Sequence, residues 1–96
     1  MRFEWDEAKN RRNLTKHRLS FDMAIEVFDD PKILSLPDRE VEGEERWHSV
    51  GLIRGTVVVL VAHAYRDEGD EEVVRIISAR KATPTERRRY EKGGQD

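Results

Sequence analysis

Apolar residues between positions 21 and 29 recur with the period of a helix. Four of them have the i, i+3, i+4, i+7 spacing of a core-facing stripe: Phe21, Ala24, Ile25 and Phe28. Ser20 can cap this helix, and Pro31 ends it. An earlier helix is predicted over residues 7–17, where Asp6 supplies the N-cap and few apolar side chains are available for packing.

Beyond residue 31 the apolar pattern has a period of two, which is typical of strands. Four strands are predicted, over about residues 33–37, 45–53, 56–66 and 72–80. Arg54-Gly55 forms a tight hairpin turn between the second and third strands, and the acidic loop 67–71 joins the third to the last. Arg2–Trp5 is predicted to be a short strand or an extended lead-in.

A capping box starts the last helix, because Thr83 can cap it, Pro84 fits its first turn and Glu86 follows three residues after the cap. The predicted layout is two N-terminal helices, an antiparallel meander of about four strands and a C-terminal helix, which is the α+β class. Residues 1–92 form a single domain, and the tail 93–96 is predicted to be disordered.

Composition limits the size of the core. Of the 96 residues, 36% are hydrophobic and 40% are charged, so a permanent partner would be a source of extra stability. The chain has no cysteine, which excludes disulfides and thiolate metal sites. No apolar run approaches the roughly 18 residues of a membrane span. The first residues also lack the apolar stretch of a signal peptide, so a cytoplasmic protein without membrane contact is expected.

Charge is segregated along the chain, although the net charge is only −2. Residues 21–45 carry a net −7 and residues 67–74 a net −5, whereas residues 75–92 carry a net +5. Basic blocks attract a polyanion, and acidic blocks suit a basic partner. The alternative is that each block is only solvated surface.

The first candidate site is a polar face of the first predicted helix. Lys9, Asn13, Lys16 and His17 have the spacing i, i+4, i+7, i+8, which aligns two cations, an amide and an imidazole. This face can hold phosphate, and His17 can exchange protons near neutral pH. The alternative is an ordinary polar stripe in which Asn13 and His17 bind nearby backbone.

A second candidate lies at the start of the second predicted strand. Arg46 and His48 point to one face of an extended strand and can act as a phosphate-and-proton pair, while Trp47 points to the other face. The alternative is that Trp47 packs in the core and Arg46 pairs with Glu44 or Glu45.

The last strand contributes arginines. Arg75 interrupts an apolar run and needs a carboxylate, a backbone group or a bound anion as its partner. Arg80-Lys81 precedes the N-terminus of the last helix, a position that favours anions. Arg75 and Arg80 lie on opposite faces of an ideal strand, so both serve one site only if the strand bends or ends near Ala79.

In the last helix, Glu86 and Tyr90 are i, i+4 neighbours that can bridge to Arg89 or Arg87. The alternative is a charge-rich surface helix that Tyr90 pins to the core. His63 is in phase with buried-looking valines, which favours a core histidine over a catalytic one. The three histidines lack a tight metal-ligand spacing, so no metal site is predicted.

Four colinear segments match one family: FEWDEAKNRRNLTKH, SFDMAIEVFDDP, GEERWHSVG and RIISARKATPTERRRYE. With these segments the chain resembles BrnT, the toxin of type II toxin–antitoxin pairs, over Phe3 to Glu91. The resemblance implies the fold of RelE-type ribonuclease toxins, in which helices pack on a small antiparallel sheet. It further implies RNA cleavage, translation inhibition and growth arrest. The implied partner is a BrnA-like antitoxin, which forms a heterotetramer with the toxin and makes the complex's contact with DNA.

The same resemblance marks functional positions. They are Lys16, His17, Arg46, Arg75, Arg80, Lys81, Glu86 and Tyr90. The chain departs from the family at Arg18, where glycine typically follows the Lys-His pair. If the backbone there needs a positive φ, Arg18 adopts it at a cost of about 1 kcal/mol.

These observations lead to the hypothesis of a metal-independent endoribonuclease without a cofactor. Its expected catalytic residues are Arg80, Arg46, Arg75, His17, Glu86 and Tyr90. Its expected RNA-phosphate ligands are Lys16, Lys81, His48 and Lys9, of which His48 is also a candidate proton carrier. The alternative is a non-catalytic binding module, or a decayed toxin, that only docks an antitoxin or nucleic acid.

Overall fold

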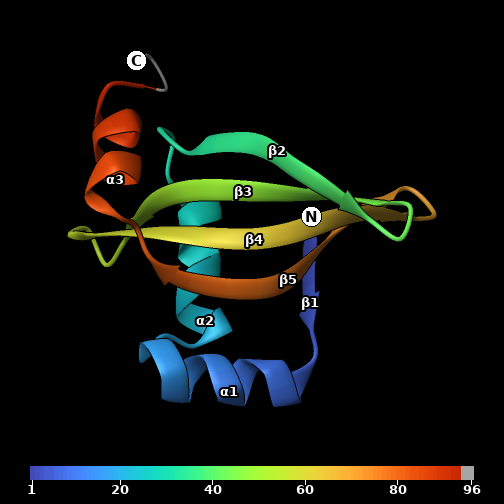
Figure 1. Ribbon diagram of the computed structural model, residues 1–96. Helices are drawn as coiled ribbons and strands as arrows, with labels where there is room; N and C mark the ends of the chain where they lie inside the picture. Colours follow the sequence, from blue (N-terminus) through green and yellow to red (C-terminus); the bar gives the residue numbers. More distant parts are fainter. Residues whose placement is uncertain (94–96) are drawn as a thin grey trace.

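A computed structural model describes residues 1–93 of the chain (Figure 1). The predicted disordered tail lies outside the described residues except for Gly93. In chain order the elements are β1 (Arg2–Trp5), α1 (Glu7–His17), α2 (Phe21–Ala24), the 3-10 helix η1 (Ile25–Asp29), β2 (Leu34–Val41), β3 (Glu44–Ile53), β4 (Val57–Glu68), β5 (Glu71–Lys81) and α3 (Pro84–Glu91). The α+β class and the bounds of the first helix are therefore as predicted.

The sheet has five strands in the order β1-β5-β4-β3-β2, where four antiparallel strands were predicted. The fifth strand is β1, where a short strand or an extended lead-in was predicted. It pairs with β5 in parallel, so that Phe3 lies beside Val74 and Trp5 beside Ile76. Alternation explains this pairing, because it puts the two aromatic rings on the face that carries the core. The β4–β5 hairpin is also tighter than predicted, since the strands continue to Glu68 and from Glu71.

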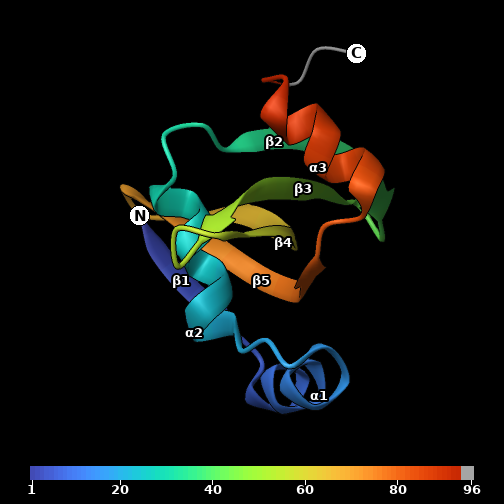
Figure 2. The same ribbon diagram turned by 90° about the vertical axis from the view of Figure 1, so that its left-hand side faces the viewer.

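Helices cover the two faces of the sheet unequally (Figure 2). On one face, which we call the core face, α2 and η1 pack over the main hydrophobic cluster. On the other, the open face, α3 covers only one end, where Tyr90 packs with Val50 and Leu60. The remainder of the open face has no helix above it. α1 lies along the edge of the sheet, against β5.

The second predicted helix is in place but changes type after its first turn. Residues 21–24 are α-helical, and residues 25–29 form a 3-10 helix. With three residues per turn, Val27 comes into line with Phe21 and Ala24, so Val27 is fully buried instead of Ile25 and Phe28. Gly51 of β3 allows this close approach, because an added Cβ would lie 3.0 Å from the Val27 Cβ.

A single side chain attaches α1 to the sheet. The Asn13 carboxamide donates to the Ala79 carbonyl (2.9 Å) and accepts from the Ala79 N–H (3.1 Å). It also donates to the Leu19 carbonyl (2.8 Å), and the residue is buried. β1 pairs with β5 only as far as Ile76. Beyond that point, Asn13 satisfies the backbone groups of Ala79 at the edge of β5. Of the predicted alternative, a polar surface stripe in which Asn13 and His17 bind nearby backbone, the backbone contacts of Asn13 are present, but Asn13 is buried rather than part of the surface.

His63 occupies the core, as its phase with the valines predicted. Its side chain is 0% exposed, and its Nε2 lies 2.6 Å from the Ser49 hydroxyl. The rings of Phe28 and Tyr65 make edge contacts with it. Burial, together with the charge of His48, lowers the pKa of His63 to about 4, so the imidazole is neutral in the folded protein.

Among residues 1–93, no helix is long and apolar enough to cross a membrane.

His63 should make the fold acid-sensitive. Its pKa is lower in the folded chain than in the unfolded one, so its contribution to stability is complete above about pH 6.5 and falls as the pH drops toward 4. We expect His63→Gln to reduce the loss in unfolding free energy between pH 7 and 4.5 by about 2 kcal/mol in urea titrations. An unchanged pH dependence would show that His63 is not responsible.

Arg18 ends α1 in the left-handed region, with φ 56 and its N–H bonded to the Leu14 carbonyl. We therefore expect Arg18→Gly to raise the unfolding free energy by about 1 kcal/mol, because glycine adopts this conformation without strain. Arg18→Ala is the control, since it removes the same charge but keeps the Cβ. A similar gain in both variants would refute backbone strain as the cause.

Candidate active site

One extra residue in β5 decides which arginines share a face. Arg80 pairs with Leu60 and Ser78 with Ala62, but the next pairs along are Ile76 with His63 and Arg75 with Ala64. Ile77 is thus a β-bulge that reverses the alternation along the strand. As a result Arg75 and Arg80 both lie on the open face. Both arginines can therefore belong to one site, whereas on an ideal strand they would lie on opposite faces.

The open face gathers basic side chains around a floor of small residues. Arg46 and His48 come from β3, and Arg75 and Arg80 from β5. Between them lie three small residues, of which two belong to β4 and one to β5: Ala62, Ala64 and Ser78. His48 pairs with Ala62, which in turn pairs with Ser78, so the imidazole stands two strands from the exposed serine.

Glu44 is shared by two of the arginines. Its Oε1 accepts from Arg46 Nε at 3.1 Å and also from Arg75 Nη2. The pairing of Arg46 with Glu44 was predicted as an alternative, whereas Arg75 was predicted only to need some anionic partner. One carboxylate thus holds two guanidinium groups on the open face, and Glu4 of β1 lies beside Arg75 in the register of the sheet.

Arg80 is held by Glu86. Its Nη1 and Nη2 donate to the two carboxylate oxygens of Glu86 at 2.7 and 2.9 Å. The same carboxylate closes the predicted capping box with Thr83. The hydrogen bond from Arg80 is the main cause that lowers the pKa of Glu86 to about 2, so Glu86 is ionised at neutral pH. The contact of Glu86 with Arg80 was not predicted, since the expected partners of Glu86 were Arg87 and Arg89.

Tyr90 turns away from these residues. Its hydroxyl donates to the Asp30 carboxylate, which also accepts the Leu52 N–H at 2.8 Å. Burial and then this hydrogen bond raise the pKa of Tyr90 to about 12. The ring is buried against Val50. This geometry corresponds to the predicted alternative in which Tyr90 pins α3 to the core.

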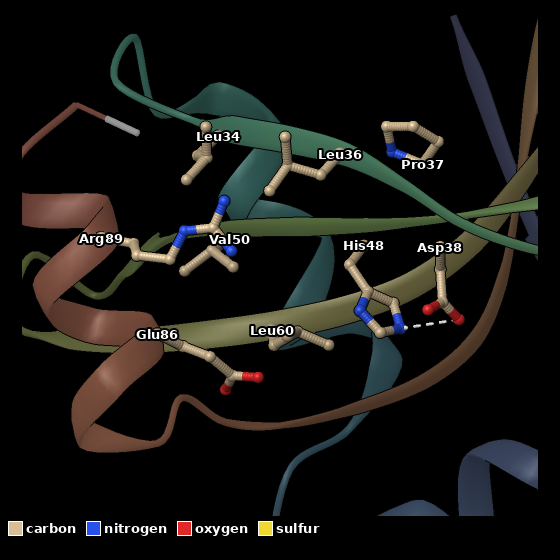
Figure 3. A pocket seen from close by; sticks show the side chains of 9 residues that line it. All are labelled: Leu34, Leu36, Pro37, Asp38, His48, Val50, Leu60, Glu86 and Arg89. Atoms are coloured by element: carbon tan, nitrogen blue, oxygen red, sulfur yellow. Dashed lines mark ion pairs between the residues drawn. The ribbon is translucent and has the colours of Figure 1, made fainter. Parts of the chain in front are cut away.

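A pocket of about 220 Å³ opens between β2 and α3 (Figure 3). Aliphatic side chains form its floor, including Leu36, Val50 and Leu60. His48 stands at one end with its Nε2 3.4 Å from an Asp38 carboxylate oxygen. Glu86 and Arg89 reach in from α3. The pocket therefore joins an apolar floor to the imidazole and to the carboxylate that holds Arg80.

The predicted basic face of α1 reaches the same region from the sheet edge. Lys9, Lys16 and His17 line a groove whose other wall includes Ile77 and Ser78 of β5. His17 thus lies beside Ser78, whereas His48 stands in the pocket between β2 and α3, with its Nε2 toward Asp38. Lys81, by contrast, pairs with the core-face residue Val59 and projects from the opposite side of β5 to Arg80.

Three residues of this region were not among the predicted site residues: Asp38, Glu44 and Arg89. Asp38 and Glu44 belong to the acidic block 21–45, and a block of like charge does not indicate which members meet an arginine. Arg89 was predicted only as a possible bridge to Glu86. Within residues 1–93, no three His, Asp or Glu side chains are grouped so that they could hold a metal ion.

In this small α+β domain, three arginines and His48 lie on one sheet face and His17 lies at its edge, and these side-chain types can bind a phosphate group. The family model described as "Ribonuclease toxin, BrnT, of type II toxin-antitoxin system" matches residues 5–86. The chain belongs to this family, and a type II system implies an antitoxin partner. The search of curated proteins finds no match.

A solved structure supports the assignment. The chain is similar to the Brucella abortus ribonuclease toxin BrnT, with 27% sequence identity and a TM-score of 0.60. The match covers 86% of this chain and 97% of the Brucella chain.

Proposed function

We propose that this BrnT-family protein cleaves RNA on the open face without a metal ion, and that a BrnA-like antitoxin neutralises it. The observation that carries the proposal is the bulge at Ile77, because it brings Arg75 and Arg80 to the face that holds Arg46 and His48. Cleavage of messenger RNA would inhibit translation and arrest growth.

The chemistry requires the ribose 2′-OH to attack the neighbouring phosphorus in line. One group must remove the proton of the 2′-OH, another must protonate the leaving 5′-oxygen, and cations must stabilise the charge on the phosphoryl oxygens. The two imidazoles at the open face are that of His48, in the pocket between β2 and α3, and that of His17, in the groove at Ser78; an imidazole can accept a proton or donate one. We assign these proton transfers to them.

Guanidinium groups supply the positive charge. A guanidinium has five N–H donors, and Arg46 and Arg75 each use one of them on Glu44. Donors therefore remain for a phosphate while Glu44 keeps both side chains extended over the open face. Arg80 is similarly oriented by Glu86, whose low pKa makes it a positioning residue in this mechanism rather than a proton donor. Tyr90 has a structural role here, because its hydroxyl is bonded to Asp30.

A second function is favoured by one observation: each of the three arginines already contacts a carboxylate in the free protein. If these ion pairs persist when RNA is present, the open face is only a docking surface for an antitoxin or nucleic acid. The protein would then be a binding module or a decayed toxin. Cleavage assays separate the two functions.

We expect purified protein to cleave RNA equally with and without EDTA. Arg80→Gln should lower kcat by about 10²–10³-fold because it removes a phosphate ligand. His48→Gln should lower it by about 10²-fold or more and should remove one limb of the pH–rate profile. Arg54→Gln is the matched control, because Arg54 lies in the β3–β4 turn and pairs with Glu26 of η1. Loss of cleavage in EDTA would refute metal independence, and full activity of Arg80→Gln would remove Arg80 from the mechanism.

Expression in a bacterial host tests the toxin itself. We expect growth arrest from the protein alone and recovery when the cognate BrnA-like antitoxin is co-expressed. The mass of the purified complex should correspond to two toxin and two antitoxin chains, and operator DNA should be bound by the complex but not by the toxin alone. Harmless overexpression of a folded protein would favour the binding module or the decayed toxin.

A further inference from the structure

The surface of α1 carries several cations that form no ion pair. Among the described residues, five cationic side chains of α1 and its C-cap form no ion pair: Lys9, Arg11, Arg12, Lys16 and Arg18. Seven arginines on or beside the sheet each form at least one: Arg2, Arg39, Arg46, Arg54, Arg66, Arg75 and Arg80. Other described cations without an ion pair are Lys32, Lys81, Arg87, Arg88 and Lys92. Among the described elements, α1 with its C-cap therefore holds the largest group of cations that form no ion pair.

The fold does not require these charges. α1 is fixed by the Asp6 cap and by the buried Asn13 carboxamide, whereas Arg11 and Arg12 are exposed. Like charges at i, i+4, such as Arg12 and Lys16, destabilise a helix. An external anion bound beside Arg12 and Lys16 would reduce this repulsion.

Two adjoining grooves are lined by several of these cations, and one of the two grooves reaches Ser78 of the open face. The first runs between α1 and β5 and includes Arg12, Lys16 and Ser78 in its walls. The second is a shallow hollow on the outer surface of α1, which is lined by Ala8, Arg11, Arg12, Thr15 and Lys16. Arg12 and Lys16 line both grooves and form a ridge between them. An RNA strand that passes from one groove to the other therefore stays beside positive charge. Leu14, 50% exposed on the same helix, adds an apolar surface beside this path.

We propose that the outer surface of α1 is a second RNA-binding element, which holds the phosphates of the strand that flanks the cleavage site. This second element rests on the proposed RNA cleavage at the open face, and with it the protein contacts a longer stretch of the RNA. Continuity with that face favours the flank of the same RNA strand over an acidic protein segment. Binding here is independent of base sequence, since the contacts are to phosphates.

The test uses a variant confined to the outer hollow, Arg11→Gln with Thr15→Glu, because neither residue lines the groove at Ser78. Affinity for a labelled RNA of about 16 nucleotides should fall about tenfold, while cleavage of an RNA of about four nucleotides should keep its kcat/KM. The slope of log K against log salt should decrease by about 1. Arg11→Lys should bind the long RNA like the wild type, because it keeps the charge.

The matched control makes the same two changes elsewhere: Arg54→Gln with Thr56→Glu, in the exposed β3–β4 turn. It should leave the affinity for the long RNA unchanged. Equal affinity and salt slope in the α1 variant would overturn the proposal, as would an equal loss for short and long RNA. Weaker binding of the antitoxin with unchanged RNA binding would assign α1 to a protein partner. Wild-type binding of long RNA without cleavage would instead refute the proposed ribonuclease and leave the RNA-binding element in place.

Discussion

The arrangement of this protein depends on one inserted residue in β5. Without the bulge at Ile77, strict alternation would send either Arg75 or Arg80 into the core face, or would bring Val74 and Ile76 out of it. With the bulge, a single strand supplies apolar residues to the core throughout its length and arginines to the open face at both ends. The candidate active site and the hydrophobic core are therefore consequences of the same local irregularity.

Local signals were sufficient for the elements but not for their assembly. Asp6 and Thr83 marked the starts of α1 and α3, and Arg54-Gly55 marked a hairpin, because caps and turns act over a few residues. The bulge leaves no mark in composition, since Ile77 is as apolar as its neighbours. The pairing of Glu44 with Arg75 joins residues 31 positions apart, so only the register of the sheet determines it. The site residues were thus predictable as types, and their carboxylate partners were not.

Part of the acidic block in the sequence pairs with basic side chains on the open face. Glu44 and Asp38 come from the strongly acidic block, yet they face Arg75 and His48 on the open face. A chain with a net charge of −2 can thereby hold a basic site, since part of its acid serves as internal counter-charge. These carboxylates orient side chains that would otherwise be mobile and repel one another. A phosphate that arrives must compete with them, which favours a ligand with several phosphates over a single inorganic ion.

The attachment of α1 through Asn13 restricts how the length of this helix can vary. Each residue of an α-helix turns its successors by about 100°. An insertion or deletion of one residue between Asp6 and Asn13 would rotate the carboxamide away from the Ala79 peptide group that it binds. Changes near one whole turn would restore its direction, although they would shift it along the edge of β5. Relatives of this chain should therefore tolerate length changes in their hairpins far more readily than in the segment that joins the first strand to this asparagine.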